Sequence, residues 1–472
     1  MVYNINVVHF WVYIIEKERK RFMSPVISLA GIVIGLILLM YLAYKGHSII
    51  WVAPVCAVVV AVMGGLSILD SYLGDYIEGV AEYIVLWFPA FFLGAVYGKL
   101  MDMTGSARSL AGKIVDIIGP KFAVAAVVIP CMLMTYGGIS LFVVVFVVYP
   151  MGYAIYRAAN LPRTLLPSAI AFGAFGITMT AVPGTPQIQN IIPTEYYGTT
   201  ATAAPLMSIV AVIAIGVPGY IYLEWRARQA RKQGLQFEED PKYKDNFADK
   251  AIILPKWHWL CGLIPLIVVV LMLNVLPGIL EKAGMAEWSS SQAIVVALFA
   301  GIIVTCIMNI KQLKILLPAI SEGANGSLLA IMNTACAVGF GSVVKVVPGF
   351  ALLKTAMLNM PGSILFSEAV AVNVLAGATG SASGGMSIAL AALGQQYLEK
   401  ANAIGLNPEY LHRIAAIASG GLDSLPHNGA ILTLFAVSNC THKESYKDLC
   451  VVVCVIPVVV SLILALVWGL FI

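Results

Sequence analysis

Charged residues are scarce in this chain of 472 residues. Aspartate, glutamate, lysine and arginine make up 11% of the sequence, whereas ordinary soluble domains contain about 25%. Hydrophobic residues make up 60% of the chain. This composition excludes an ordinary soluble domain and predicts a polytopic, all-α membrane protein.

Patterns for nucleic-acid, metal and disulfide chemistry are also lacking. The net charge of +4 is spread over loops, without a basic face interleaved with aromatic residues, so no nucleic-acid partner is expected. The eight cysteines fall mostly inside apolar stretches, where cysteine behaves as a small hydrophobe. Cys450 and Cys454 share a helix face, but no histidine or second cysteine pair completes a ligand set. We therefore expect no metal, no cofactor and no disulfide framework.

What the chain does contain is a series of apolar stretches, five in each half. In the first half they lie near residues 25–44, 49–69, 83–100, from 163 (interrupted) and 203–223. In the second half they lie near residues 260–280, 292–310, 324–347, from 411 (interrupted) and 451–472. An amphipathic stretch over residues 104–118 is expected to lie along the membrane interface. Together these stretches predict ten spans.

Two small polar segments, residues 135–140 and 377–385, are each flanked by short apolar arms. Arms of about 14 residues form about 20 Å of helix, less than a hydrocarbon core of about 30 Å. Broken backbone survives at membrane depth only where it is buried in protein or lines a wet cavity. These segments therefore predict the tips of two re-entrant hairpins that face a binding site. A glycine-rich loop at the surface is the alternative.

Two of the spans are broken, at residues 178–190 and 419–430. Pro183, Gly184 and Pro186 cannot continue a helix, and Pro426 lies in the second break. The breaks free backbone amides and carbonyls in the middle of the predicted membrane.

The two halves repeat each other. Gly137 and Gly380, Ser140 and Ser383, and Pro183 and Pro426 are each 243 residues apart, and Gly79 lies 244 residues before Gly323. Five spans and one hairpin in each half invert the second half relative to the first. Inverted repeats with broken helices at matching positions are typical of secondary transporters. The predicted divisions are an N-terminal extension (1–22), a first repeat (23–223), a cytoplasmic linker (224–257) and a second repeat (258–472).

Basic residues set the expected orientation. Placing Arg226, Arg228, Arg231 and Lys232 in the cytoplasm also places Arg163 there. The basic cluster of residues 17–21 would then lie outside, which conflicts with this rule. One hypothesis is that Met23 is the natural start and residues 1–22 are an upstream extension.

The candidate substrate-binding residues lie in the tips and breaks: Gly137, Gly138, Ser140, Thr185, Gln187, Asn190, Thr379, Gly380, Ser381, Ser383, Ser424 and Asn428. Helix starts at the tips present free amides and the positive end of a helix dipole, which favour a carboxylate. Neither tip nor break contains lysine or arginine. We expect neutral donors to hold a small organic anion that must also leave.

Asp423 and His427 are the only acidic or basic residues in these four segments. Ionisable groups inside a membrane are functional hypotheses by default, and histidine titrates near neutrality. Both residues are therefore candidates for proton coupling. Asp423 capping the broken helix and His427 bonding a freed carbonyl are the alternatives. Glu368, Lys345 and Lys354 are expected to extend toward the membrane surface.

These segments resemble the gluconate permease family of the ion transporter superfamily, over essentially residues 23–472. The likeness is most specific at residues 135–140, 183–190, 381–386 and 423–429. It implies proton-coupled uptake of a hydroxy-acid anion across a bacterial inner membrane, with the hairpins and broken spans moving against a scaffold at a homodimer interface.

This chain departs from that family at two motifs. Tyr136-Gly137 stands where gluconate permeases typically have Tyr-Glu, and residues 182–186 replace a Pro-Pro-His-Pro-Gly-Pro run. 3-Hydroxybutyrate, or a di- or tricarboxylate carried with sodium, is therefore an open alternative substrate. An intramembrane hydrolase using Ser424 or Ser383 with His427 is disfavoured because no Gly-x-Ser-x-Gly motif is present. A passive anion channel is the other rival.

Overall fold

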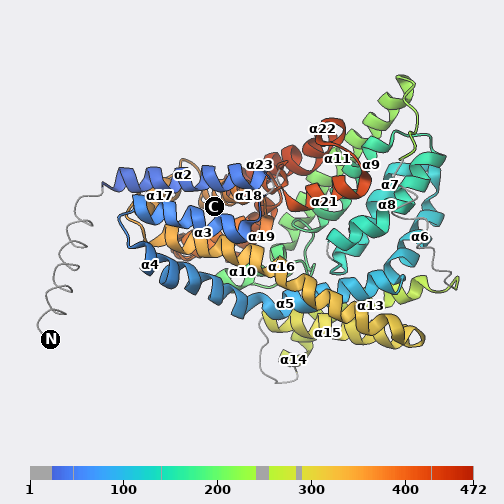
Figure 1. The fold of residues 1–472 in the computed structure, drawn as a ribbon, viewed down its shortest axis with the longest axis horizontal. Helices are drawn as coiled ribbons and strands as arrows, with labels where there is room; N and C mark the ends of the chain where they lie inside the picture. Colours follow the sequence, from blue (N-terminus) through green and yellow to red (C-terminus); the bar gives the residue numbers. More distant parts are fainter. Residues whose placement is uncertain are drawn as a thin grey trace, which may run out of the picture.

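The computed structural model describes residues 24–45, 47–139, 141–240, 255–282, 290–426 and 428–470. Every regular element in these ranges is a helix, in agreement with the predicted all-α fold (Figure 1). Five helical stretches in them are long and apolar enough to cross a membrane: 25–42, 68–103, 205–232, 310–346 and 442–470. Five other apolar helices are shorter, so the count of ten spans stays a prediction. The proposed extension, residues 1–22, lies outside the described ranges.

The first half contains α2 (Pro25–Tyr44), α3 (Ile49–Met63), α4 (Ile68–Asp70), the π-helical η1 (Ser71–Tyr76), α5 (Ile77–Met103), α6 (Ser106–Ile118), α7 (Ala123–Tyr136), α8 (Leu141–Ala158), α9 (Leu166–Ala171), the π-helical η4 (Phe172–Thr178), α10 (Ile188–Tyr197) and α11 (Pro205–Lys232). Here α7 and α8 form the first hairpin, and the gap between η4 and α10 is the first break.

The second half contains α13 (Trp259–Asn274), α14 (Leu276–Lys282), α15 (Ser290–Met308), α16 (Leu313–Val346), α17 (Gly349–Leu358), α18 (Ile364–Thr379), α19 (Ala382–Ala403), α20 (Pro408–Ser419), the short turn η7 (Leu422–Ser424), α21 (Gly429–Ser438), α22 (His442–Cys450), the π-helical η8 (Val451–Val455) and α23 (Ile456–Leu470). Here α18 and α19 form the second hairpin, and residues between α20 and α21 form the second break.

Several helix ends differ from the predicted ones. The second span ends at Met63, because Gly64 caps α3 and Gly65 follows with a φ of +74°. The next helix then begins at Ile68 rather than at residue 83. The arm α19 has 22 residues, or about 33 Å of helix, so the expectation that neither hairpin arm could span the core is wrong for this arm. Apolar windows locate only the apolar middle of a helix, and α19 continues through Glu399 and Lys400.

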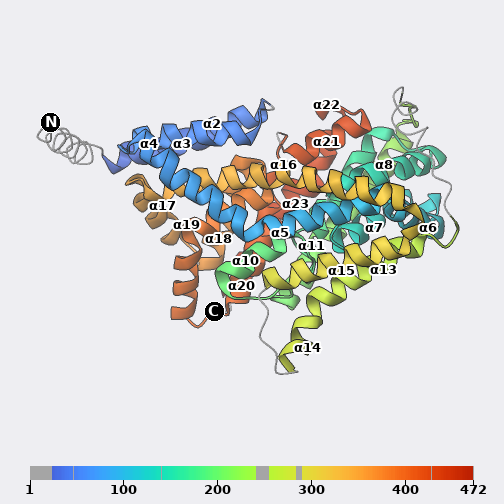
Figure 2. The same cartoon turned by 60° about the horizontal axis from the view of Figure 1, so that its bottom comes forward.

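The centre of the fold is the pair α5 and α16, which run side by side across the molecule (Figure 2). A Cβ added at Gly79 would lie 2.2 Å from Ser342 Oγ, and one added at Gly323 would lie 2.6 Å from Val96 Cα. Because the start of α5 meets the end of α16 and the reverse, the two helices are antiparallel. The two glycines matched by the sequence repeat therefore allow close contact at both ends of the same helix pair.

The other packing contacts also recur between the halves. Helix α3 packs on α16 as α15 packs on α5, and α2 packs on α3 as α13 packs on α15. Across the halves, α10 packs on the hairpin arm α19 as α21 packs on the hairpin arm α8. Each broken helix thus lies against the hairpin of the other half. The predicted domain limits stay predictions.

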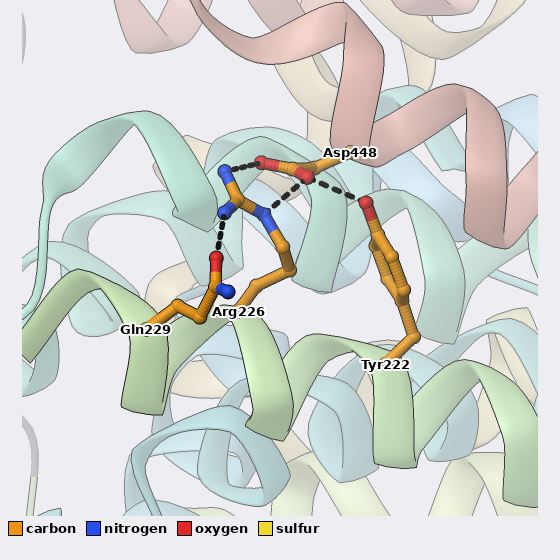
Figure 3. Close-up of polar contacts among 4 residues, drawn as sticks. All are labelled: Tyr222, Arg226, Gln229 and Asp448. Atoms are coloured by element: carbon orange, nitrogen blue, oxygen red, sulfur yellow. Dashed lines mark hydrogen bonds and ion pairs between the residues drawn. The ribbon is translucent and has the colours of Figure 1, made fainter. Parts of the chain in front are cut away.

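A half-buried ion pair joins α11 of the first half to α22 of the second half (Figure 3). Arg226 of α11 donates from Nε to Asp448 Oδ1 at 2.6 Å and from Nη2 to Oδ2 at 3.0 Å. The hydroxyl of Tyr222 donates to Asp448 Oδ1 at 2.7 Å. Such a two-pronged contact fixes α22 on α11 in one orientation.

Candidate substrate site

The first hairpin tip is held by the break of its own half. Helix α7 ends at Tyr136, and Gly138 has a φ of +90°, a conformation that favours glycine. Gln187 Nε2 donates to Thr135 O at 2.7 Å and to Ile139 O at 3.3 Å. The side-chain amide of Gln187 therefore ties two carbonyls of the first tip to the first break. The candidate Ser140 lies outside the described residues.

Two asparagine side chains also support the backbone of the first break. Asn190 Nδ2 donates to Thr185 O at 2.9 Å and to Ala201 O at 2.8 Å. Asn274 Nδ2, at the end of α13, donates to Gly184 O at 2.8 Å. Thr185 and Asn190 are fully buried. In this conformation the amide nitrogen of Asn190 supports the irregular backbone of the break.

The second hairpin tip is a tight connection between two helices. Helix α18 ends at Thr379, whose hydroxyl donates to Leu375 O at 3.0 Å, and Gly380 is left-handed with a φ of +60°. Ser381 caps α19 by accepting from the Gly384 amide at 3.2 Å, and its hydroxyl lies 3.5 Å from that of Ser383. The hydroxyls of Ser381 and Ser383 thus lie close together at this tip.

The second break is organised by Asn428. Its Oδ1 accepts from the amides of Ala430 at 2.7 Å and Ile431 at 3.1 Å, which caps α21. Its Nδ2 donates to Gly380 O at 3.1 Å and to Asp423 O at 3.0 Å. Asp423 is buried and accepts from the Ser424 hydroxyl at 3.0 Å. Asn428, rather than Asp423, caps this broken helix. His427 lies outside the described residues.

Both halves therefore use the same device, in which an amide side chain from the break bonds to a carbonyl at the hairpin tip of the same half. We call these the first half-site (residues 135–139 and 178–190) and the second half-site (residues 377–385 and 419–428, without His427). The two breaks also touch each other, since a Cβ at Gly420 would lie 2.7 Å from Thr180 Cγ2. The predicted residues are thus brought together within each half, and the breaks join the halves.

Two buried arginines, neither of them a candidate from the sequence, fasten each half to the other. Arg413 of α20 is fully buried, and it donates from Nη1 to Asn190 Oδ1 at 2.9 Å and from Nη2 to Ala203 O at 2.9 Å. Arg163 donates to Asn439 O at 3.2 Å and also bonds to Ser438 O. Each guanidinium satisfies carbonyls that follow the broken helix of the other half. The signal available in the sequence was a basic residue, Arg413, inside an apolar span.

Glu368 is not at the membrane surface as expected. It is fully buried in α18, and its Oε1 accepts a hydrogen bond from the hydroxyl of Tyr197 in α10. Its other oxygen has no hydrogen-bond partner among the described residues. The burial of Glu368 could not be predicted, because no residue near it in the sequence indicates that the hydroxyl of Tyr197 faces it.

No family model matches the chain. Over 450 residues it is 40% identical to the uncharacterized transporter YxjC of Bacillus subtilis (strain 168), covering 89% of this chain and 94% of that protein. The chain belongs to the YxjC transporter family. This relationship makes it a membrane transporter rather than an enzyme.

Two solved structures share the fold of this YxjC-family transporter. The YdaH transporter of Alcanivorax borkumensis, described as having an unusual topology, aligns with a TM-score of 0.54 at 15% identity, over 86% of this chain and 89% of that one. MtrF of Neisseria gonorrhoeae, described as illuminating a class of antimetabolite efflux pumps, aligns with a TM-score of 0.54 at 13% identity, over 94% and 95%. At these identities the likeness concerns the fold alone, and it supports a multi-pass membrane protein.

Proposed function

We propose that this transporter is a secondary active carrier that moves a small hydroxy-carboxylate anion, of the gluconate or 3-hydroxybutyrate type, together with protons. The observation that carries the proposal is the pair of half-sites, in which uncharged side chains hold two broken helices at two hairpin tips. Broken helices at matching positions of two repeats are the usual binding-site architecture of such carriers.

The anion preference is supported by the helix starts at the second half-site. Helices α19 and α21 both begin there, with Ser381 and Asn428 as their capping residues. Helix starts carry partial positive charge and free amides, which stabilise a carboxylate. The absence of lysine and arginine from the tips and breaks keeps that attraction moderate, as release of the anion requires.

Proton coupling is supported by Asp423, which is buried beside the second break with Ser424 as its hydroxyl partner. His427 stays a second candidate for this role. A carboxyl group that gains and loses a proton as access alternates would link proton movement to anion movement.

The proposal also covers the membrane location, the oligomeric state and the functional relatives of the protein. We place the protein in a bacterial inner membrane as a homodimer that is related in function to the gluconate permease family. The antiparallel pairing of α5 with α16 supports two inverted repeats, and their long contact suits a scaffold against which hairpins and broken helices move.

The test is uptake of labelled gluconate and 3-hydroxybutyrate into proteoliposomes with an imposed pH gradient, with a sodium gradient, and with neither. Accumulation driven by the pH gradient alone is expected. Accumulation that requires sodium would replace protons by sodium and favour a di- or tricarboxylate carrier. Equilibration without accumulation under any gradient would favour a channel. Because MtrF is described as an efflux pump, preloaded vesicles should be assayed for export as well.

A further inference from the structure

We propose that Glu368 is a proton-binding group of the transport cycle, held by Tyr197 of the opposite half. This inference rests on the proposed proton-coupled function and adds a proton-binding group on a hairpin arm to the candidates in the break. In each cycle the carboxylate would take one proton from water on one side of the membrane and release it to water on the other. Only an O–H bond is formed and broken.

The position of Glu368 is the first argument. Its side chain is fully buried in α18, in the second hairpin, which the proposed function assigns to the moving part. The group that meets it, Tyr197, ends α10, the second segment of the broken helix in the first half. The carboxyl group thus lies between two elements of the proposed moving part, and movement of that part against the scaffold would change its access to water.

The surroundings of Glu368 are the second argument. Among the described residues, no lysine, arginine or histidine makes an ion pair with it, and Oε2 lacks a hydrogen-bond partner. A buried carboxylate without a cation is not compensated for its lost hydration. One phenol hydrogen bond and an otherwise unpaired oxygen therefore favour the neutral acid while the group is buried. A group that must be neutral when buried and can ionise when wetted is suited to carrying a proton.

The ionisable neighbours on the packed helices are otherwise engaged. On α19, the hydroxyl of Tyr397 lies 3.1 Å from that of Ser367. On α20, His412 Nδ1 lies 2.7 Å from the Thr199 hydroxyl, while Arg413 bonds to Asn190 and to carbonyls of the first half. Asp423, in the turn η7 that also packs on α18, accepts from Ser424. None of these contacts neutralises Glu368.

The sequence repeat adds a third argument. The position 243 residues before Glu368 is Ala125, so the first hairpin has no matching carboxyl group. A residue needed only for packing between the repeats would be expected in both halves, as Gly79 and Gly323 are in α5 and α16. The carboxyl group of Glu368 is instead present only in the second hairpin.

The first test does not depend on the substrate. Infrared spectra of the full-length protein in proteoliposomes at neutral pH should contain the carbonyl stretch of a protonated carboxylic acid, shifted by deuterium exchange. Glu368→Gln should remove one component of this band, both in the wild-type background and in Asp423→Asn, whereas Glu399→Gln, an exposed position of the same hairpin, should leave the band unchanged. A band that Glu368→Gln leaves unchanged in both backgrounds, or none in the wild type, would overturn the inference. Should Glu368→Gln not fold, Tyr197→Phe keeps the acid and removes its hydrogen bond. An unshifted band in Tyr197→Phe would then count against the assignment.

The second test separates this inference from the proposed function. In proteoliposomes with a pH gradient, Glu368→Gln should accumulate no more 3-hydroxybutyrate or gluconate than without the gradient, whereas Glu399→Gln should accumulate as the wild type does. Normal gradient-driven accumulation by Glu368→Gln would refute the role of Glu368 and leave proton symport intact. Failure of the wild type to accumulate either anion would refute the proposed substrates, while the infrared result would still decide whether Glu368 holds a proton.

Discussion

The two half-sites share a backbone arrangement but differ in charge. In the first, Gln187 bonds to the tip carbonyls of Thr135 and Ile139, and no acidic or basic residue lies in the tip or break. In the second, Asn428 bonds to Gly380, and Asp423 is buried alongside. The two halves match at the glycines where α5 and α16 pack together. They differ in the half-sites, where only the second contains a carboxyl group that could bind a proton. Variants of the packed glycines and of the buried polar contacts should therefore impair stability and transport to different degrees.

Gly323→Leu and Gly79→Leu should destabilise the protein most, and to a similar extent. Any side chain at Gly323 meets the backbone of α5, with the Val96 Cα only 2.6 Å away, so the helices must separate. Overpacking of this kind costs about 3 kcal/mol. Thermal unfolding in detergent should show equal losses for the two variants. Gly326→Leu and Gly74→Leu, whose Cβ positions meet no atom within 4 Å, are the controls. Unequal losses would contradict equivalent roles for the two glycines.

Arg413→Met should be the next most costly change. It leaves Ala203 O and Asn190 Oδ1 without their charged donor in a fully buried setting, which costs about 2 kcal/mol. Arg157→Met is the control, because Arg157 is 64% exposed in its ion pair with Glu239. Thermal unfolding should separate them clearly. Equal stability of the two variants would show that Arg413 does not fasten the halves together.

Asp448→Asn tests the link between α11 and α22. It weakens the paired contact with Arg226 and leaves a guanidinium with less compensation, at an expected cost of about 1.5 kcal/mol. The control is Glu322→Gln, since Glu322 is 54% exposed in its ion pair with Lys99, and such surface pairs contribute at most about 1 kcal/mol. A larger loss from Glu322→Gln, measured by the same unfolding assay, would reverse this ranking.

Asn428→Ala should have the smallest effect on stability and a distinct effect on transport. Loss of the cap on α21 costs about 1 kcal/mol, but the bond that holds the tip at Gly380 disappears as well. Uptake should fall more than folded yield does. Asn407→Ala, which removes the cap of α20 at a position away from the half-sites, is the matched control. If both variants lower uptake in proportion to stability, the tip contact has no part in transport.

The positions of the two helix breaks were largely predictable from the sequence, whereas the distant residues that bond to the breaks and hairpins were not. The ends of η4 at Thr178 and of α20 at Ser419 fall where the sequence predicts the breaks, because proline and glycine act on their own backbone. The length of α19, the burial of Glu368 and the role of Arg413 were missed. Local patterns do not encode which distant residue a side chain will meet.

The amino-acid sequence alone indicates a membrane protein with two repeated halves, two hairpin tips and two broken helices, because composition and the positions of proline and glycine act locally. That Tyr197 faces Glu368, 171 residues away, and that Arg413 bonds to Ala203, 210 residues away, became clear from the folded protein. A buried polar group must find its partner within the packed protein. That partner is chosen by how the two halves pack together.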